Sequence, residues 1–215
     1  MSRTRVGVLL SGSGSNLQAL IDACQAPDFP AEIVLVVSNR QDAFGLQRAE
    51  AAGIDRRWLP HRGMSRQDYD EELVGALRLM EVEVVCLAGF MRIVTPTLLD
   101  AFPGRVMNIH PALLPAFPGL HGQAQALSWG VTVAGATVHL VDAGTDTGPI
   151  LCQGVVPALQ GDDEAALQER ILRAEHRLYP LALRWLCEGR VHVEGRRARV
   201  DLKPGESRSL FLPAP

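Results

Sequence analysis

The sequence contains no run that approaches the roughly 18 consecutive apolar residues needed to cross a bilayer, although 47% of its 215 residues are hydrophobic. Its opening, MSRTRVGVLLSGSG, reaches glycines too soon for the apolar stretch of a secretory signal peptide. These absences argue against a membrane protein and predict a cytoplasmic location.

An excess of basic residues is also lacking. The chain has 21 Lys and Arg against 24 Asp and Glu, for a formal net charge of −3. A protein without a basic field is poorly suited to a nucleic-acid backbone, so we expect no nucleic-acid partner. Any anionic ligand must therefore be bound by a local site.

The four cysteines form no C-x-x-C pair. They are Cys24, Cys86, Cys152 and Cys187. This spacing argues against a disulfide framework and against a zinc cluster, and favours small buried apolar residues. The histidines likewise show no i, i+4 ligand pair, so we expect no metal site.

The segment VGVLLSGSGSNLQAL, residues 6–20, runs from an apolar strand through two glycines into a helix. It lacks the third small residue of a dinucleotide-binding loop, because Leu17 stands there, and it lacks the lysine of a Walker A loop. A Gly- and Ser-rich turn at a helix N-terminus still favours a single phosphate. The alternative is a tight strand-to-helix turn with no ligand.

Strand-like and helix-like segments alternate through the first half of the chain. The strands are RVGVLL, EIVLVV and VEVVCLA, and the helices are residues 16–25, 43–52 and 66–80. This rhythm predicts an α/β fold, Rossmann-like, with an open, mostly parallel twisted sheet and helices on both faces.

The second half of the chain has a different pattern. RVMNIHP reads as a short strand, and VTVAGATVHLV and PILCQGVVP are joined so closely by DAGTDTG that they should pair antiparallel. A long helix is predicted from about 163 to 187. Its apolar stripe comprises Leu167, Ile171, Ala174, Leu178, Leu181 and Trp185.

Asn108 and His110 end a predicted strand, where ligands of open α/β sheets bind. Side chains alternate along a strand, so these two project on the same side. Pro111 keeps His110 out of the helical region. An amide and an imidazole therefore converge on one small volume, although a lone histidine is more often structural.

The loop DAGTDTGP supplies two acids, Asp142 and Asp146. Both suit a turn in which an aspartate binds its own backbone. Alternatively, one of them lies near His110 and orients it as a general acid or base. Spacing alone does not choose between the two acids.

Several segments in this order resemble the phosphoribosylglycinamide formyltransferase family of purine biosynthesis. They include SGSGSNLQALIDA, LAGFMRIVTP, MNIHPALLPAFPGLHG and GATVHLVDAGTDTGPI, and the similarity spans roughly residues 5 to 188. NIHPALLP followed by DTGPI is highly specific for enzymes that use formyltetrahydrofolate. The resemblance implies one catalytic domain over 1–190, with a phosphate-binding half (1–103) and a folate-binding catalytic half (104–190). Residues 191–215 would form a tail or a small edge hairpin.

The resemblance also implies substrates and roles. The reaction would move a formyl group from 10-formyltetrahydrofolate, a co-substrate, to the amine of glycinamide ribonucleotide, without a metal. Asn108, His110 and Asp146 would form the catalytic set. The ribonucleotide would be bound by Gly14, Ser15, Asn16 and Glu175.

The folate pocket is implied in the same way. Its residues would be Arg66, Met91, Arg92, Ile93, Val94 and Asp142, with Arg66 on the glutamate of the folate. The resemblance further implies a cis peptide bond between Leu114 and Pro115.

Three alternatives fit less well. Methionyl-tRNA formyltransferase has a further C-terminal domain and a basic surface, and formyltetrahydrofolate hydrolase has an extra N-terminal domain. We expect neither, because only a short segment follows the last predicted helix and the chain starts directly at the phosphate loop. A non-catalytic sensor domain with the same fold is disfavoured by the three catalytic residue types.

Overall fold

The computed structural model describes residues 2–212 and divides them into two compact units, up to Asn108 and from Ile109 onward. Residue 1 of the predicted catalytic domain and residues 213–215 of the predicted tail lie outside the described residues. None of the helices within 2–212 is both long enough and apolar enough to span a membrane.

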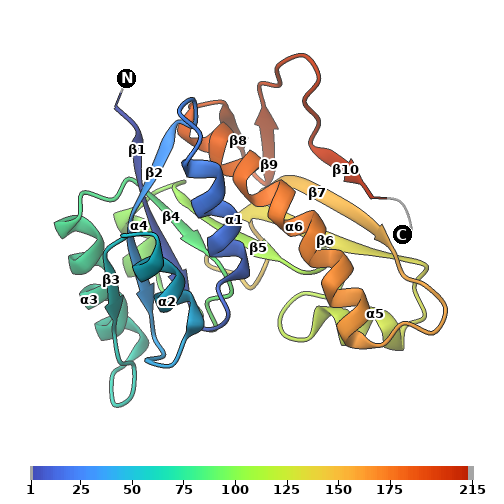
Figure 1. The fold of residues 1–215 in the computed structure, drawn as a ribbon, viewed down its shortest axis with the longest axis horizontal. Coiled ribbons are helices and arrows are strands. Elements are labelled where there is room, and N and C mark those ends of the chain that lie inside the picture. The colour runs from blue at the N-terminus through green and yellow to red at the C-terminus, as the bar shows by residue number, and fades with distance from the viewer. Residues whose placement is uncertain (1, 213–215) are drawn as a thin grey trace. The chain divides into compact units, whose positions relative to one another are not determined.

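The first unit is built on parallel strands (Figure 1). The strands are β1 (Thr4–Leu10), β2 (Ala31–Ser38), β3 (Arg56–Trp58), β4 (Val84–Leu87) and β5 (Val106–His110), whose last two residues belong to the second unit. Their order is β3-β2-β1-β4-β5, and each adjacent pair is parallel. Because these strands are parallel, their carboxyl ends share one edge of the sheet, and the loop after the central strand β1 lies at that edge.

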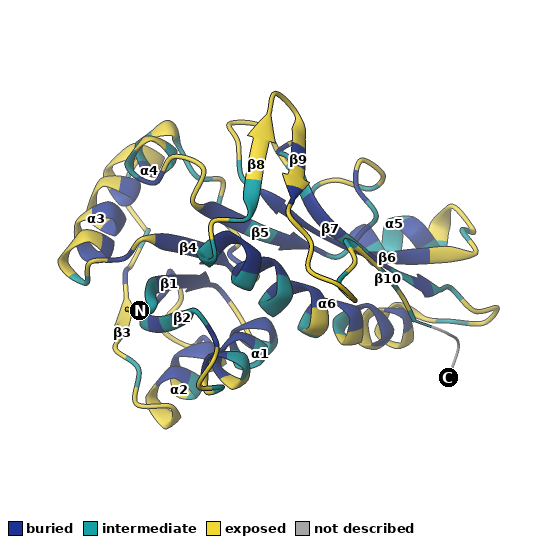
Figure 2. Cartoon of the chain, turned by 90° about the horizontal axis from the view of Figure 1, so that it is seen from above, coloured by how far each residue is buried: buried dark blue, intermediate teal, exposed yellow. Residues whose placement is uncertain are grey.

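Helices cover both faces of the first unit's strands. They are α1 (Ser15–Cys24), α2 (Phe44–Ala51), α3 (Arg66–Leu79) and α4 (Pro96–Ala101). Figure 2 shows α1 and α2 on one side and α3 and α4 on the other, with buried residues facing the strands. The predicted parallel sheet with helices on both faces is confirmed here.

The second unit contains the antiparallel part of the sheet. Its elements are α5 (Gly122–Ser128), β6 (Val133–Leu140), β7 (Ile150–Pro157), α6 (Glu164–Cys187), β8 (Val191–Glu194), β9 (Arg197–Val200) and β10 (Ser209–Phe211). β6 pairs antiparallel with β7, as predicted from their short connection. β8 and β9 form an antiparallel hairpin, and β9 and β10 both pair parallel with β7.

Helix α6 packs on β6 and β7. Asp163 caps it by accepting a hydrogen bond from Ala166 N at 2.8 Å. Of its predicted apolar stripe, all members are buried except Leu181, which is half-buried while Ala182 and Leu183 beside it are buried. The helix therefore turns a slightly different face to the sheet than the spacing suggests.

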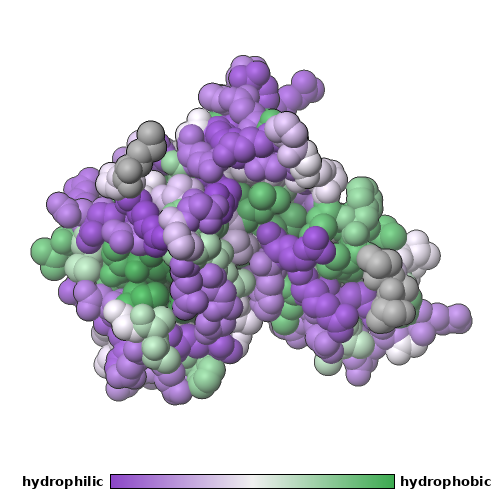
Figure 3. Space-filling model, turned by 45° about the horizontal axis from the view of Figure 1, so that its top comes forward, coloured by the Kyte–Doolittle hydropathy of each residue, from purple (hydrophilic) through white to green (hydrophobic). Residues whose placement is uncertain are grey.

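Burial follows the strands closely. Val6, Val8, Leu9 and Leu10 of β1 are fully buried, whereas hydrophilic residues cover much of the face seen in Figure 3.

At Gly135 of β6, a Cβ atom would lie 1.8 Å from the backbone oxygen of Gly154 in β7. This close approach of two backbones admits only glycine.

Candidate active site

The loop between β1 and α1 depends on Gly14. This residue is the N-cap of α1 and has φ of 71°, in the left-handed region. A Cβ atom there would also lie 2.6 Å from the Cα atom of Gly45. Both the backbone angle and the close approach therefore require glycine.

The same loop is tied to α2 rather than to a capping side chain. Gly45 N donates to Gly12 O at 3.1 Å, and Arg48 Nε donates to Ser13 O at 3.0 Å. Gly14 has no side chain with which to cap α1, and the first turn carries no acid. The N–H groups of that turn, which have no intrahelical acceptor, and the positive end of the helix dipole suit an anion.

The segment 91–94, predicted to contact folate, lies between β4 and α4. Met91 and Ile93 are 65% and 54% exposed. The guanidinium of Arg92 lies 4.1 Å from the ring centroid of Tyr69 in α3. The segment thus presents apolar side chains to solvent while a cation–π contact anchors it to α3.

Helix α3 also holds the end of this segment. The buried carboxylate of Asp70 accepts hydrogen bonds from Thr95 N at 2.6 Å and Thr95 Oγ1 at 2.8 Å. Arg66, predicted to meet the glutamate of folate, is the exposed first residue of the same helix. Val94 is half-buried just before Thr95.

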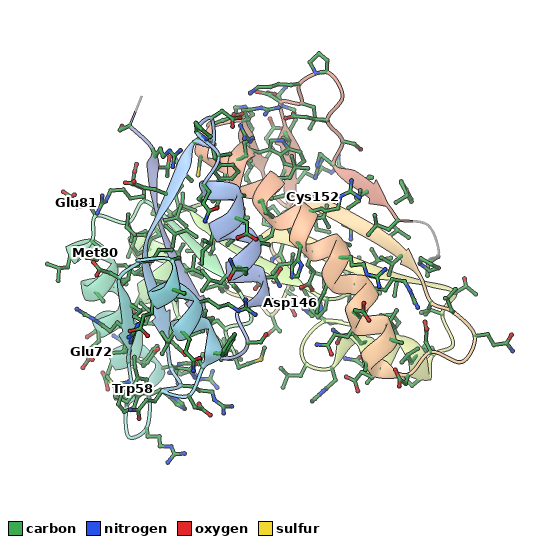
Figure 4. All side chains as sticks on the ribbon, viewed as in Figure 1. Trp58, Glu72, Met80, Glu81, Asp146 and Cys152 are labelled. Carbon is green, nitrogen blue, oxygen red and sulfur yellow. The ribbon has the colours of Figure 1, made fainter. Side chains whose placement is uncertain are left out.

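In the second unit, His110 and Asp146 lie together although 36 positions separate them in the chain. Nδ1 of His110 is 3.4 Å from Oδ2 of Asp146. Both side chains are largely buried, with 5% and 13% exposed. Asp146, labelled in Figure 4, stands on the loop between β6 and β7.

Backbone groups of the segment after β5 hold both side chains. Nε2 of His110 contacts Phe117 O at 2.8 Å, and Gly119 N donates to Oδ2 of Asp146 at 2.7 Å. The peptide bond between Leu114 and Pro115 is cis, as predicted. Phe117 and Asp146 both have positive φ, 53° and 54°. Such conformations are uncommon for residues with side chains and cluster at functional sites.

His139 completes this cluster, and the sequence patterns gave no sign of it beyond placing it in a strand. Its Nε2 lies 3.6 Å from Oδ1 of Asp146, and its side chain is 2% exposed. The register of β6 against β7 shifts between Val138 and His139. The shift leaves Leu151 of β7 as the extra residue, and such an irregularity carries no pattern in the sequence.

Each of the two imidazoles uses the single N–H of its neutral form in a hydrogen bond to a backbone carbonyl. A carbonyl oxygen only accepts, so Nε2 of His110 donates to Phe117 O and Nδ1 of His139 donates to Leu140 O, at 2.8 Å each. A neutral ring would then present a lone pair to Asp146. An attractive contact requires a further proton on a ring or on the carboxylate.

Electrostatics favour the ionised form of Asp146. Burial alone raises the pKa of its carboxyl group, but contact with His139, the hydrogen bond from Gly119 N–H and the nearby charge of His110 outweigh burial. The net pKa lies below its usual value of 3.8. The carboxylate therefore stabilises the fold above the unfolded-state pKa, and this contribution is lost as the pH falls through the lower folded value.

Asp142, the other acid of the loop, faces its own backbone. Oδ1 of Asp142 accepts from Gly144 N at 3.1 Å and from Thr147 Oγ1 at 2.6 Å. Arg196, at the turn of the β8–β9 hairpin, donates to Thr147 O at 3.3 Å. Asp142 thus shapes the loop, and the hairpin contacts the residue after Asp146.

The other predicted residues lie in β5, α6 and α1. Asn108 is half-buried in β5, opposite Leu87 of β4; its convergence with His110 and Asp146 stays a prediction. Glu175 is a buried acid in α6. Ser15 and Asn16 form the first turn of α1, and Asn16 is buried.

Comparison with known proteins identifies close relatives. The sequence model described as "Formyl transferase" matches residues 4–183. The phosphoribosylglycinamide formyltransferase of Escherichia coli (strain K12) is 44% identical over 195 residues, covering 90% of this chain and 92% of that enzyme. Trifunctional purine biosynthetic protein adenosine-3 of Drosophila pseudoobscura pseudoobscura is 50% identical, but this chain covers only 15% of its length.

Solved structures give the same result for the fold. Glycinamide ribonucleotide transformylase 1 from Symbiobacterium toebii superposes with a TM-score of 0.91 at 51% identity, covering 92% of this chain and 94% of that one. Phosphoribosylglycinamide formyltransferase from Anaplasma phagocytophilum also gives 0.91, at 36% identity and 98% coverage of both chains.

The contacts of Asp146 should be visible in its titration. In a ¹³C NMR titration of side-chain-labelled aspartates, the Asp146 carboxyl should have a pKa below 3.8. The variant His139→Leu should raise that pKa, because it removes the contact that lowers it most and leucine has no donor to replace it. As a matched control, His192→Leu should raise the pKa of Asp201, its own partner, and leave Asp146 unchanged. An Asp146 pKa that is the same in His139→Leu as in the parent would contradict this explanation.

Proposed function

This chain belongs to the formyl transferase family, and we propose that it transfers a formyl group from 10-formyltetrahydrofolate to the amine of glycinamide ribonucleotide in purine biosynthesis. The observation that carries the proposal is the Asp146 carboxylate set between the imidazoles of His110 and His139. A small negative net charge fits small-molecule substrates in the cytoplasm, with no nucleic-acid partner.

The ribonucleotide supplies one phosphate, which suits the loop after β1. Backbone N–H groups of Ser15 and Asn16 open α1 behind a left-handed Gly14, and this arrangement accepts a single anion. Glu175, buried in α6, is our proposed partner for the glycinamide end. A carboxylate there attracts the amine that must react.

Folate is proposed to bind along Met91–Val94 and the loop that carries Asp142. The exposed side chains of Met91 and Ile93 offer apolar area to a flat pteridine ring. The exposed Arg66 offers a guanidinium to the carboxylates of the glutamate, which such a group binds in a bidentate manner.

The chemistry needs no nucleophile from the protein. The amine of the ribonucleotide attacks the formyl carbon, a C–N bond forms, and negative charge gathers on the formyl oxygen. The bond from that carbon to the folate nitrogen then breaks, and the proton lost by the amine ends on the leaving nitrogen. Protonated His110 and Asn108 are proposed to stabilise the oxyanion, an effect worth about 2.7–4 kcal/mol per donor at other sites.

Asp146 is proposed to stabilise the imidazolium of His110 and to assist proton transfer, directly or through water. The donor that His110 would offer to the oxyanion is its Nε2–H, which Phe117 O accepts in this structure. Substrate would take the place of that carbonyl. Phe117, whose backbone is left-handed, is the residue that would have to move.

The first test compares the two acids of the β6–β7 loop. Asp146→Asn keeps shape but removes the charge beside His110, so kcat should fall by about 100-fold or more, while both substrates still bind. Asp142→Asn retains the oxygen that accepts from Gly144 and Thr147, so the loop should keep its shape and kcat should stay close to that of the parent. Its effect should fall mainly on KM for formyl folate, because the charge that is lost belongs to the proposed folate site. Steady-state kinetics with direct titration of both ligands separates these effects. Normal turnover of Asp146→Asn would overturn the assignment.

The second test concerns the phosphate loop. Gly14→Val places a side chain 2.6 Å from the Gly45 backbone, so it should distort the loop and weaken ribonucleotide binding by about tenfold or more. Gly53→Val is the matched control, because Gly53 has nearly the same φ, 68°, with nothing within 4 Å of its Cβ position. Both variants should lose stability from backbone strain, but only the first should lose affinity in a calorimetric titration. Equal affinity of the two variants would argue against the cradle.

A further inference from the structure

Ser11 occupies a buried position between two segments of the first unit. It directly follows β1 and is 5% exposed. Its N–H donates to Gly89 O at 3.0 Å, and its hydroxyl accepts a hydrogen bond from Met91 N at 2.8 Å. One residue therefore binds both ends of the turn at residues 89–91.

The hydroxyl of Ser11 has a fixed orientation. Its single proton is donated to Oδ1 of Asn39 at 2.6 Å, so a lone pair is left for Met91 N–H. Asn39, buried after β2, is held in turn by His61, whose Nδ1 contacts Asn39 O at 3.2 Å. This chain of contacts joins the segments that follow β1, β2, β3 and β4.

The segments joined at Ser11 are those assigned to different ligands. Ser11 leads into the loop that ends at Gly14 and α1, and Met91 begins the stretch Met91–Val94. In the part of the chain that the structure describes, Met91 makes no other hydrogen bond to residues 11–14, the loop that leads into α1. Loss of the Ser11 hydroxyl would leave Met91 N–H and the Asn39 amide oxygen without this partner, in a part-buried site.

We infer that Ser11 is a positioning residue, which fixes the Met91–Val94 segment against the phosphate loop so that both substrates find preformed sites. This inference rests on the proposed function for the identity of the ligands. Ser11 touches neither ligand in this account and acts through the two segments it joins.

The test pairs Ser11→Ala with Ser38→Ala. Ser38 is also a buried serine at the end of a strand, and its hydroxyl accepts from Arg40 N at 3.0 Å without joining the two segments. By calorimetry with each ligand alone, Ser11→Ala should weaken both glycinamide ribonucleotide and 10-formyltetrahydrofolate by about five- to thirtyfold. Ser38→Ala should weaken neither, although thermal denaturation should show a comparable loss of stability in both variants.

Hydrogen exchange supplies a readout that does not depend on the ligands. The Met91 amide should exchange about tenfold faster or more in Ser11→Ala than in the parent, and at the parental rate in Ser38→Ala. Unchanged exchange at Met91, or weakening of only one ligand, would overturn the inference. If the parent chain bound neither ligand, the proposed function would fail, while exchange at Met91 would still decide the role of Ser11.

Discussion

This site depends on one constraint: a carboxylate lies between two imidazoles, and each imidazole already donates to a backbone carbonyl. Asp146 accepts from Gly119 N–H and faces ring nitrogens of His110 and His139. An attractive contact with either ring therefore calls for a proton beyond the one that the ring donates to a carbonyl. Left-handed backbone at Phe117 and Asp146 costs about 1–2 kcal/mol per residue. These two conformations bring Phe117 O to His110 and the Asp146 carboxylate to both imidazoles. The contacts formed in this way offset the cost.

The two units contribute in different ways to the proposed reaction. In the first, the proposed anion site would rest on backbone geometry, since Gly14 has a left-handed conformation and lies against Gly45. In the second, charge is concentrated in a few buried side chains around Asp146. A transfer in which the substrate amine is the nucleophile needs this combination, because the protein has only to hold two ligands, stabilise an oxyanion and move a proton.

Much of the fold was predictable, because long segments with a regular apolar period determine their own secondary structure. Helix α6 and strands β1, β2, β6 and β7 follow their predicted segments closely. The missed elements are short: β3 and β10 have three residues each, α4 has six and α5 has seven. His139 was missed because the alternation of side chains along a strand does not show which loop residue a side chain will meet. The two acids of the loop could not be ranked by spacing, but their contacts distinguish them.

The central claim, transfer rather than hydrolysis or binding alone, is tested most directly by following the formyl carbon itself. With ¹³C-formyl folate and glycinamide ribonucleotide, NMR should show the label leave the folate and appear on the ribonucleotide amine in equal amounts. Label released as formate would indicate a hydrolase. Binding of both ligands with no movement of the label would indicate a sensor domain, and either result would contradict the account.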